Sequence, residues 1–476
     1  MGLSSRATRL PRPASATAVI LSLLIFAEIG IYGANRTDLA LAFAAVWFAV
    51  LALMLLRAGF RKALEATPLA LVAIPFGLSV AVCALAMTPF APGGPHPVWR
   101  WVAGGPSVAA IDPYATLIEI IKLLALAAAF LIGVLVGRDD ERAKAFVRSL
   151  LVVGIAYAGW ALVAHSLNID FSFNAARIAN EPLRLSATLQ SANTAATLFG
   201  ALMMLNLADL ERKLERTRSG RGYDFELIER TAPALALPVI GFATAVSCLT
   251  LTVSRSGLAI ALGLCVVLFG LRGFAQARRG GFVAPVIAVI VILGGITLTS
   301  LALNVAFLGH RLSFVDASLA SRQTLVAAHW SAFEASPWSG YGLGSFARID
   351  AKIMNHANLA ALYETTAAHN VYVQWLEEAG ILGATPMFVC VALIVWQLMI
   401  GVVRRTRMRT WLIGILAVTA LFLLHGITDS DLEIPGMATF FALLLGVGYA
   451  IAAPRRRVAE ATSRGDKKAA SATPAS

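Results

Sequence analysis

The stretch His369-Asn-Val-Tyr-Val-Gln-Trp-Leu-Glu-Glu-Ala-Gly380-Ile-Leu-Gly383 lies where the longest polar insert of the chain meets a long apolar run. It predicts a short helix that begins at His369, because apolar residues recur at helical spacing from Tyr372 to Ala379. Gly380 is then expected to stop or bend this helix before the apolar run begins. A titratable imidazole is therefore expected at the boundary between a polar segment and a membrane helix.

The rest of the chain reads as membrane protein. Of its 476 residues, 58% are hydrophobic and only 14% are charged, whereas about a quarter of the residues of a soluble domain are charged. Apolar runs recur along the whole length, and a run of about 17–25 residues is long enough to cross a bilayer as a helix. We therefore predict an all-α integral membrane protein with about twelve transmembrane helices, at residues 16–33, 39–56, 68–87, 114–136, 146–165, 186–207, 233–252, 256–271, 282–305, 380–402, 410–428 and 436–453.

The basic residues give this arrangement an orientation. Of the 39 lysines and arginines, 29 fall in the two tails and in alternate loops when Arg148, at the start of a span, is counted with the loop beside it. Such an excess marks the cytoplasmic side. Scattered over short segments, these residues form no basic face for nucleic acid, so no nucleic-acid partner is expected. The domain boundaries that follow are a cytoplasmic tail over 1–15, transmembrane helices over 16–305, a long periplasmic loop containing short helices over 306–379, transmembrane helices over 380–453, and a disordered cytoplasmic tail over 454–476.

The residue types that commonly hold metals form no strong pattern. All four cysteines lie inside predicted spans, which favours small core residues and neither a disulfide framework nor a thiolate site. The segment Asp429-Ser430-Asp431 has the form of the metal-binding DxD motif of sugar transferases, but three residues often match by chance. The chain contains no zinc-ligand spacing, so neither a metal nor another cofactor is expected.

Two arginines are candidates for binding an anion. Arg255 lies between two apolar runs that are joined by almost no loop, and an arginine inside a membrane costs about 2.5–3.5 kcal/mol on insertion scales. It either binds an anion or reaches to the membrane interface. Arg322 lies on a predicted amphipathic helix of the insert over 320–336, where a solvated position is the alternative. A guanidinium stays charged and matches two phosphate oxygens at once.

His369 is the candidate for proton transfer. The first turn of a helix carries partial positive charge, which disfavours a charged imidazole. A general base must be neutral before it takes a proton. The alternative interpretation is a histidine that only caps or packs against its helix.

Taken in order, these segments resemble the O-antigen ligase superfamily of bacterial inner-membrane glycosyltransferases, which includes O-antigen ligases, O-antigen and exopolysaccharide polymerases and protein O-oligosaccharyltransferases. The resemblance covers about residues 184–450. It is carried by His369-Asn370 with Gly380 and Gly383 at the family spacing, by Thr252-Val-Ser-Arg255-Ser-Gly, and by Ser321-Arg322 followed by Pro337-Trp-Ser-Gly-Tyr-Gly-Leu-Gly344.

The resemblance implies a fold similar to the GT-C glycosyltransferases and a metal-independent, inverting transfer. The donor would be a glycan on undecaprenyl diphosphate, with Arg255 and Arg322 holding the diphosphate and His369 acting on the acceptor hydroxyl. The acceptor would be lipid A-core or another glycan, and the protein would lie in the bacterial inner membrane with both termini in the cytoplasm. A second group of candidate site residues comprises Arg184, Asn193, Asn370, His425 and Asp429.

The sequence leaves the acceptor open. The His-Asn pattern favours a ligase of lipopolysaccharide biosynthesis over an O-antigen or exopolysaccharide polymerase, and a protein transferase shares the same motifs. An exporter or flippase of lipid-linked sugars is a further alternative. Such a transporter typically shows repeated halves with matching broken helices, and no such repeat is visible in this sequence.

Overall fold

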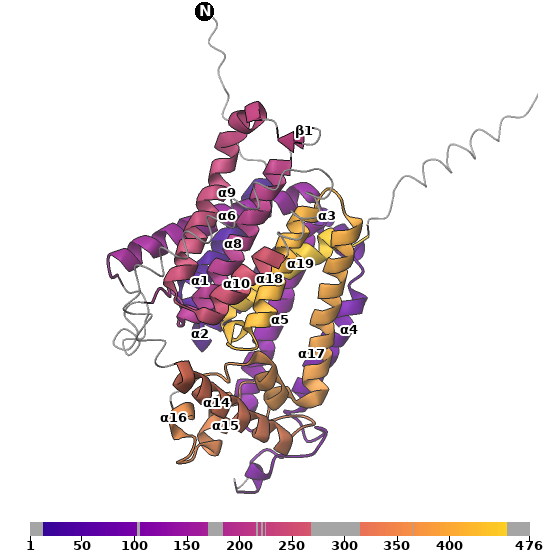
Figure 1. Cartoon of the computed structure of the whole chain (residues 1–476). Helices are drawn as coiled ribbons and strands as arrows, with labels where there is room; N and C mark the ends of the chain where they lie inside the picture. The colour runs from indigo at the N-terminus through magenta and orange to yellow at the C-terminus, as the bar shows by residue number, and fades with distance from the viewer. Residues whose placement is uncertain are drawn as a thin grey trace, which may run out of the picture.

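The computed structural model describes residues 13–101, 105–169, 184–215, 218–219, 222–223, 225–267, 315–363 and 365–454. Apart from two short strands, the regular structure in these ranges is helical (Figure 1). The α-helices are α1 (Pro13–Gly30), α2 (Thr37–Leu55), α3 (Ala58–Glu65), α4 (Ala70–Leu85), α5 (Pro113–Gly137), α6 (Asp140–Ser166), α8 (Ala192–Leu214), α9 (Phe225–Leu251), α10 (Arg255–Cys265), α14 (Val315–Ala335), α15 (Phe346–Ile353), α16 (Leu359–Leu362), α17 (Val371–Arg404), α18 (Arg409–His425) and α19 (Pro435–Ala452).

The remaining regular elements are short. Three 3-10 helices lie in connections, namely η1 (Tyr32–Ala34), η2 (Pro97–Trp101) and η5 (Asp431–Glu433). The strands β1 (Arg218–Ser219) and β2 (Gly222–Tyr223) pair antiparallel as a small hairpin between α8 and α9.

Helices coincide with eleven of the twelve predicted spans, and the span at 282–305 lies outside the described residues. A stricter test asks whether each helix is long and apolar enough to cross a bilayer. By that test 6 described helices can cross a membrane, or 7 if the bent pair α3 and α4 forms one span. α1, α10 and α18 are apolar but shorter. The long apolar helices thus identify a multi-pass membrane protein. The number of twelve spans and their orientation remain predictions.

Two helices form the centre of the bundle. Nearly all of α19 is buried, and it packs most extensively against α5. Glycines permit this contact, because a side chain at Gly133 would run into the backbone of Leu443 and one at Gly446 into that of Phe130. Close backbone approach through small residues is typical of membrane helices. The second central helix, α8, is buried along most of its length between α9 and α18.

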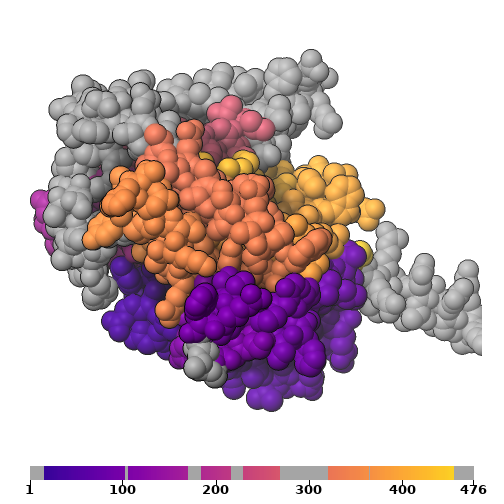
Figure 2. Space-filling model, turned by 90° about the horizontal axis from the view of Figure 1, so that it is seen from below, coloured from indigo at the N-terminus to yellow at the C-terminus, as the bar shows by residue number. Residues whose placement is uncertain are grey.

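The helices of the insert gather at one end of the bundle. α14, α15 and α16 lie together at this end, beside the loop that contains η2, while α3 and β1 lie at the opposite end (Figure 1). A view of the insert end shows the segments around residue 100 in contact with those between 320 and 380 (Figure 2).

A kink at Gly380 joins the insert to the bundle. α17 continues through this residue, which has φ 62° and ψ 179°, so the helical hydrogen bonds break there. The turn over 337–342 pairs with the freed groups: the amides of Tyr341 and Gly342 donate to the carbonyls of Glu377 and Glu378, and the amides of Ile381 and Leu382 donate to those of Pro337 and Trp338. Buried backbone groups need such partners. The glycine-rich run is therefore a turn that fits against the break.

Candidate active site

The kinked helix α17 presents His369 at its start. Asn370 is the N-cap, and its side-chain oxygen accepts hydrogen bonds from the amides of Tyr372 and Val373, each at 3.1 Å. Asparagine is among the preferred residues at this position. His369 itself has φ 49°, an uncommon backbone conformation that turns the chain sharply into the helix.

The imidazole of His369 contacts a carboxylate from another segment. Its Nδ1 atom lies 3.3 Å from Oδ1 of Asp429, in the loop between α18 and α19. Asp429 is buried, whereas the side chain of His369 is 34% exposed. Burial alone would raise the pKa of Asp429, but the hydrogen bond and charge of His369 and the charge of His425 hold this pKa below its usual value. An ionised Asp429 favours the His369 tautomer that carries its proton on Nδ1, which leaves Nε2 as a proton acceptor.

Arg322 contacts the same loop at Thr428, the residue before Asp429. Its Nη1 atom donates to the backbone oxygen of Thr428 at 3.0 Å, and Thr428 precedes Asp429. The loop thereby brings Arg322 of α14 and His369 of α17 to neighbouring positions. These two sequence candidates are separated in the chain but lie in one region of the structure.

A second histidine–aspartate pair lies on the bundle side of this loop. Nδ1 of the buried His425 lies 2.6 Å from Oδ2 of Asp431, and Nε2 of the same ring lies 3.0 Å from Oγ of Ser256. Thr197 of α8 also hydrogen-bonds Asp431. The pair therefore links α8, α10, α18 and η5 through the side chains of Thr197, Ser256, His425 and Asp431.

The remaining candidates lie where α8, α9 and α10 meet. Arg184 donates from Nη2 to Oδ1 of Asn193 at 2.8 Å and from Nε to the carbonyl of Thr252 at 2.8 Å. Arg255 opens α10 with an exposed side chain, next to Ser256, which contacts His425. Contacts thus run from Arg184 through the break between α9 and α10 towards the loop with Asp429.

A buried cluster that the sequence did not reveal ties the insert to α17. Nδ1 of His329 lies 2.8 Å from Oε1 of Glu377, and Nε2 of the same ring lies 3.3 Å from Oδ1 of Asp350. The ring is fully buried and stacks on Phe346. Burial raises the pKa of Asp350, and its hydrogen bond to His329 opposes this rise.

Helical spacing makes this cluster relevant to the site. His329 follows Arg322 by seven residues, and Glu377 follows Asn370 by seven, so each pair shares one face of its helix. The contact between His329 and Glu377 therefore fixes how α14 and α17 lie against each other. The seven-residue spacing from Arg322 to His329 and from Asn370 to Glu377 is visible in the sequence. That His329 and Glu377 contact each other is visible only in the structure.

The two aspartates of the DxD segment point to different partners. Asp429 contacts His369 and Asp431 contacts His425. Within the described ranges, no group of three His, Cys, Asp or Glu side chains is placed to hold a metal ion. One oxygen of each aspartate, Oδ2 of Asp429 and Oδ1 of Asp431, is buried and has no hydrogen-bond partner among the residues that the structure describes.

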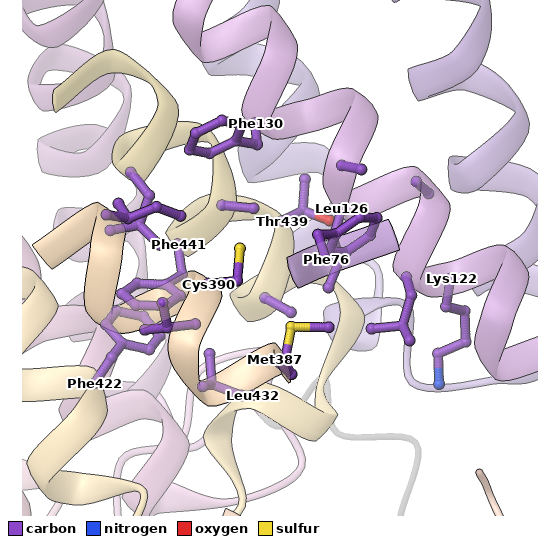
Figure 3. A pocket seen from close by; sticks show the side chains of 18 of the residues that line it. Phe76, Lys122, Leu126, Phe130, Met387, Cys390, Phe422, Leu432, Thr439 and Phe441 are labelled. Atoms are coloured by element: carbon purple, nitrogen blue, oxygen red, sulfur yellow. The ribbon is translucent and has the colours of Figure 1, made fainter. Parts of the chain in front are cut away.

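A large, mostly apolar cavity lies next to the start of α17. It has a volume of about 890 Å³ and lies among α2, α4, α5, α17 and α19. Figure 3 shows aromatic, aliphatic and sulfur-containing side chains around it, including Phe76, Phe130 and Met387, with Lys122 at one side. Lys122 pairs with Glu119 at 2.7 Å. Val371 and Tyr372, immediately after the His369-Asn370 pair, also line the cavity.

Comparison with known families agrees with the resemblance seen in the motifs. Residues 240–388 match the family model of the O-antigen ligases. The matched segment includes Arg255, Arg322, His369 and Asn370. A search of curated proteins found no match.

Proposed function

Because the chain belongs to the O-antigen ligase superfamily by this domain, we propose that it transfers a glycan from undecaprenyl diphosphate to an acceptor hydroxyl at the outer face of the bacterial inner membrane. The acceptor proposed first is lipid A-core. The observation that carries the proposal is the contact between His369 and Asp429, next to the hydrogen bond from Arg322 to the carbonyl of Thr428. It brings an imidazole whose side chain is 34% exposed and a guanidinium into contact with the same loop, and this supports a joint role for the two side chains.

In this proposal His369 is the general base. The acceptor oxygen attacks the anomeric carbon of the donor sugar, and its proton passes to Nε2 of His369. The bond from the anomeric carbon to the diphosphate oxygen breaks, and its electron pair stays on the diphosphate. Asp429 stabilises the imidazolium that forms, because its ionised carboxylate already faces Nδ1.

The arginines would stabilise the leaving group. The diphosphate gains negative charge as the bond breaks, and guanidinium groups held in place lower the energy of that state. Arg322 would act from α14 and Arg255 from the start of α10. Arg184, Asn193 and His425 would support the segment around Arg255, because their hydrogen bonds join α8, Thr252 and Ser256.

The apolar cavity would receive hydrocarbon from a lipid-linked substrate. Its lining is mostly apolar and includes Val371 and Tyr372, which directly follow His369-Asn370 in the chain. The charged residues among the lining are Glu28, Glu119, Lys122, Glu378 and Glu433. Burying lipid chains in such a cavity is favourable, at about 25 cal/mol per Å² of apolar surface. A lipid bound there would keep its head group at the level of the imidazole.

Analysis of surface glycans in a deletion strain tests this function. Free lipid A-core together with polymer retained on the carrier lipid is the expected result. Single repeats attached to lipid A-core would instead identify a polymerase. Unchanged surface glycan and carrier-linked pools would contradict both glycosyltransferase activities.

A further inference from the structure

A second hollow lies on the insert end of the molecule. It has a volume of about 880 Å³ and is lined by residues of the segments 96–99 and 111–113, together with Tyr341, α14, α15 and the turn that follows α15. The two walls are joined by a hydrogen bond from the amide of Ile111 to the carbonyl of Tyr341, and by the ion pair of Arg348 with Asp112 at 3.1 Å. Figure 2 shows these chain segments in contact on this face. A pocket of this size suits a ligand of several rings.

The charge of the hollow favours an anion. Arg348 and Lys352 both line it, and Asp112 is the only carboxylate among the lining residues. Asp112 is already engaged, since it pairs with Arg348 and caps the first turn of α5 through the amide of Ala115. In the described part of the chain, no carboxylate lies within ion-pair distance of the exposed Lys352. One positive charge is therefore left uncompensated in the hollow.

Histidine and aromatic side chains add the features of a sugar site. Burial, and then the charge of Lys352, lower the pKa of His96. Its Nδ1 accepts from the amide of Val98 at 3.2 Å, so the proton of the neutral ring resides on Nε2 as a donor. The polar atoms of Trp99 and Tyr341 already bond the carbonyls of Ala110 and Ala332. Tyr341 is buried with its ring against His96, whereas the half-buried ring of Trp99 offers an apolar face of the kind on which the C–H faces of pyranose rings stack.

We propose that this hollow binds an anionic oligosaccharide, the sugar portion of one of the two substrates, bearing phosphate or carboxylate groups. The inference rests on the proposed glycan transfer. Lys352 and Arg348 contact the anionic groups, and Trp99 packs against a sugar ring. The face of α14 that lines the hollow, with Ala328 and Ser331, is not the face that carries Arg322 and His329. The hollow therefore holds sugars away from the reacting bond and selects the glycan.

Direct binding to the purified full-length protein tests the proposal without turnover. The two probes are the phosphate-bearing core oligosaccharide released from lipopolysaccharide, which represents the acceptor, and the delipidated donor glycan. Each is also measured after its phosphate or carboxylate groups are removed or neutralised. The variants are Lys352→Glu and Trp99→Ala, and Lys62→Glu in α3 at the other end of the bundle is the control with the same charge change.

Lys352→Glu should weaken binding of one anionic probe by about tenfold, because the reversed charge turns an attraction into a repulsion. The neutral form of that probe should bind wild type and Lys352→Glu equally, and Trp99→Ala should weaken both forms. If the core oligosaccharide shows this pattern, the hollow binds the acceptor. If the delipidated donor glycan shows it, the hollow binds the donor. Absence of binding by both probes, or equal binding by Lys352→Glu and Lys62→Glu, would overturn the proposal. A wild-type protein that binds a probe in this pattern but transfers no glycan would instead refute the proposed function.

Discussion

Nδ1 of His369 lies 3.3 Å from Oδ1 of Asp429, although the two residues are 60 positions apart in the chain. The carboxylate is buried and the imidazole is one-third exposed, with the side chain of His369 at 34%. One ring nitrogen is thus held from inside the protein, and among the described residues the other has no hydrogen-bond partner. This is the arrangement that a histidine needs to act as a general base.

Replacing His369 should remove turnover while leaving donor binding nearly intact. General-base assistance is worth about 10²–10⁴ in rate, so His369→Ala should lose most transfer. His369→Gln should not restore it, since an amide forms hydrogen bonds but does not accept the proton. Transfer and donor binding are measured for both variants at several pH values. A glutamine variant with nearly wild-type rate would make His369 an orienting residue only.

The arginine variants test the proposed diphosphate site. Arg322→Ala should weaken donor use by roughly tenfold to a hundredfold, the loss of about one or two charged hydrogen bonds. Arg255→Lys should be nearly as damaging as Arg255→Ala, because lysine keeps the charge but loses the paired N–H groups. The KM for donor in a reconstituted assay measures both effects. Wild-type donor use in Arg255→Ala and Arg322→Ala would remove the diphosphate role.

The buried cluster at His329 should control both stability and the geometry of the site. His329→Ala leaves Glu377 and Asp350 buried without their shared partner, and breaking a buried pair costs about 3–5 kcal/mol. We expect a lower Tm together with weaker donor use, since α14 and α17 lose their contact. His356→Ala, an exposed change in the same insert, is the control. Equal Tm and equal donor KM for the two variants would contradict this role.

Chemical labelling tests the predicted orientation. In a background without the four native cysteines, Ala357→Cys on the insert should react with a membrane-impermeant reagent in intact spheroplasts, because Ala357 is exposed on the proposed outer side. Lys62→Cys in α3 should react only after lysis. The reverse pattern would invert the topology and would place the candidate site in the cytoplasm.

The long apolar helices could be predicted from sequence because each carries its own signal. Apolar runs such as 114–136 appear in the structure as α5 (Pro113–Gly137) with a shift of only one residue at each end. The bend at Gly380 was also foreseen, since glycine before an apolar run favours a break. The cause of the bend could not be predicted, because the hydrogen-bond partners of the backbone groups at the break come from the distant residues 337–342.

The polar contacts were less accessible to prediction. His369, Arg322 and Asp429 were each candidates, but their meeting depends on how the loop after α18 crosses the start of α17. Glu377 lies off the apolar positions that recur at helical spacing from Tyr372 to Ala379, yet it is fully buried against His329. Pairing between distant charged residues leaves no periodic pattern in the sequence. Arg255 was expected between two apolar runs, and it lies there as the first residue of α10 with an exposed side chain.

The most direct test of the central claim is a double-mutant cycle of His369→Ala and Asp429→Asn, with transfer rates measured in the reconstituted protein. Asp429→Asn keeps the shape of the side chain but removes the charge that holds the His369 tautomer. If the two residues act as one unit, the double variant is no slower than His369→Ala alone, because the effects of coupled residues are not additive. Independent losses that multiply in the double variant would contradict the account.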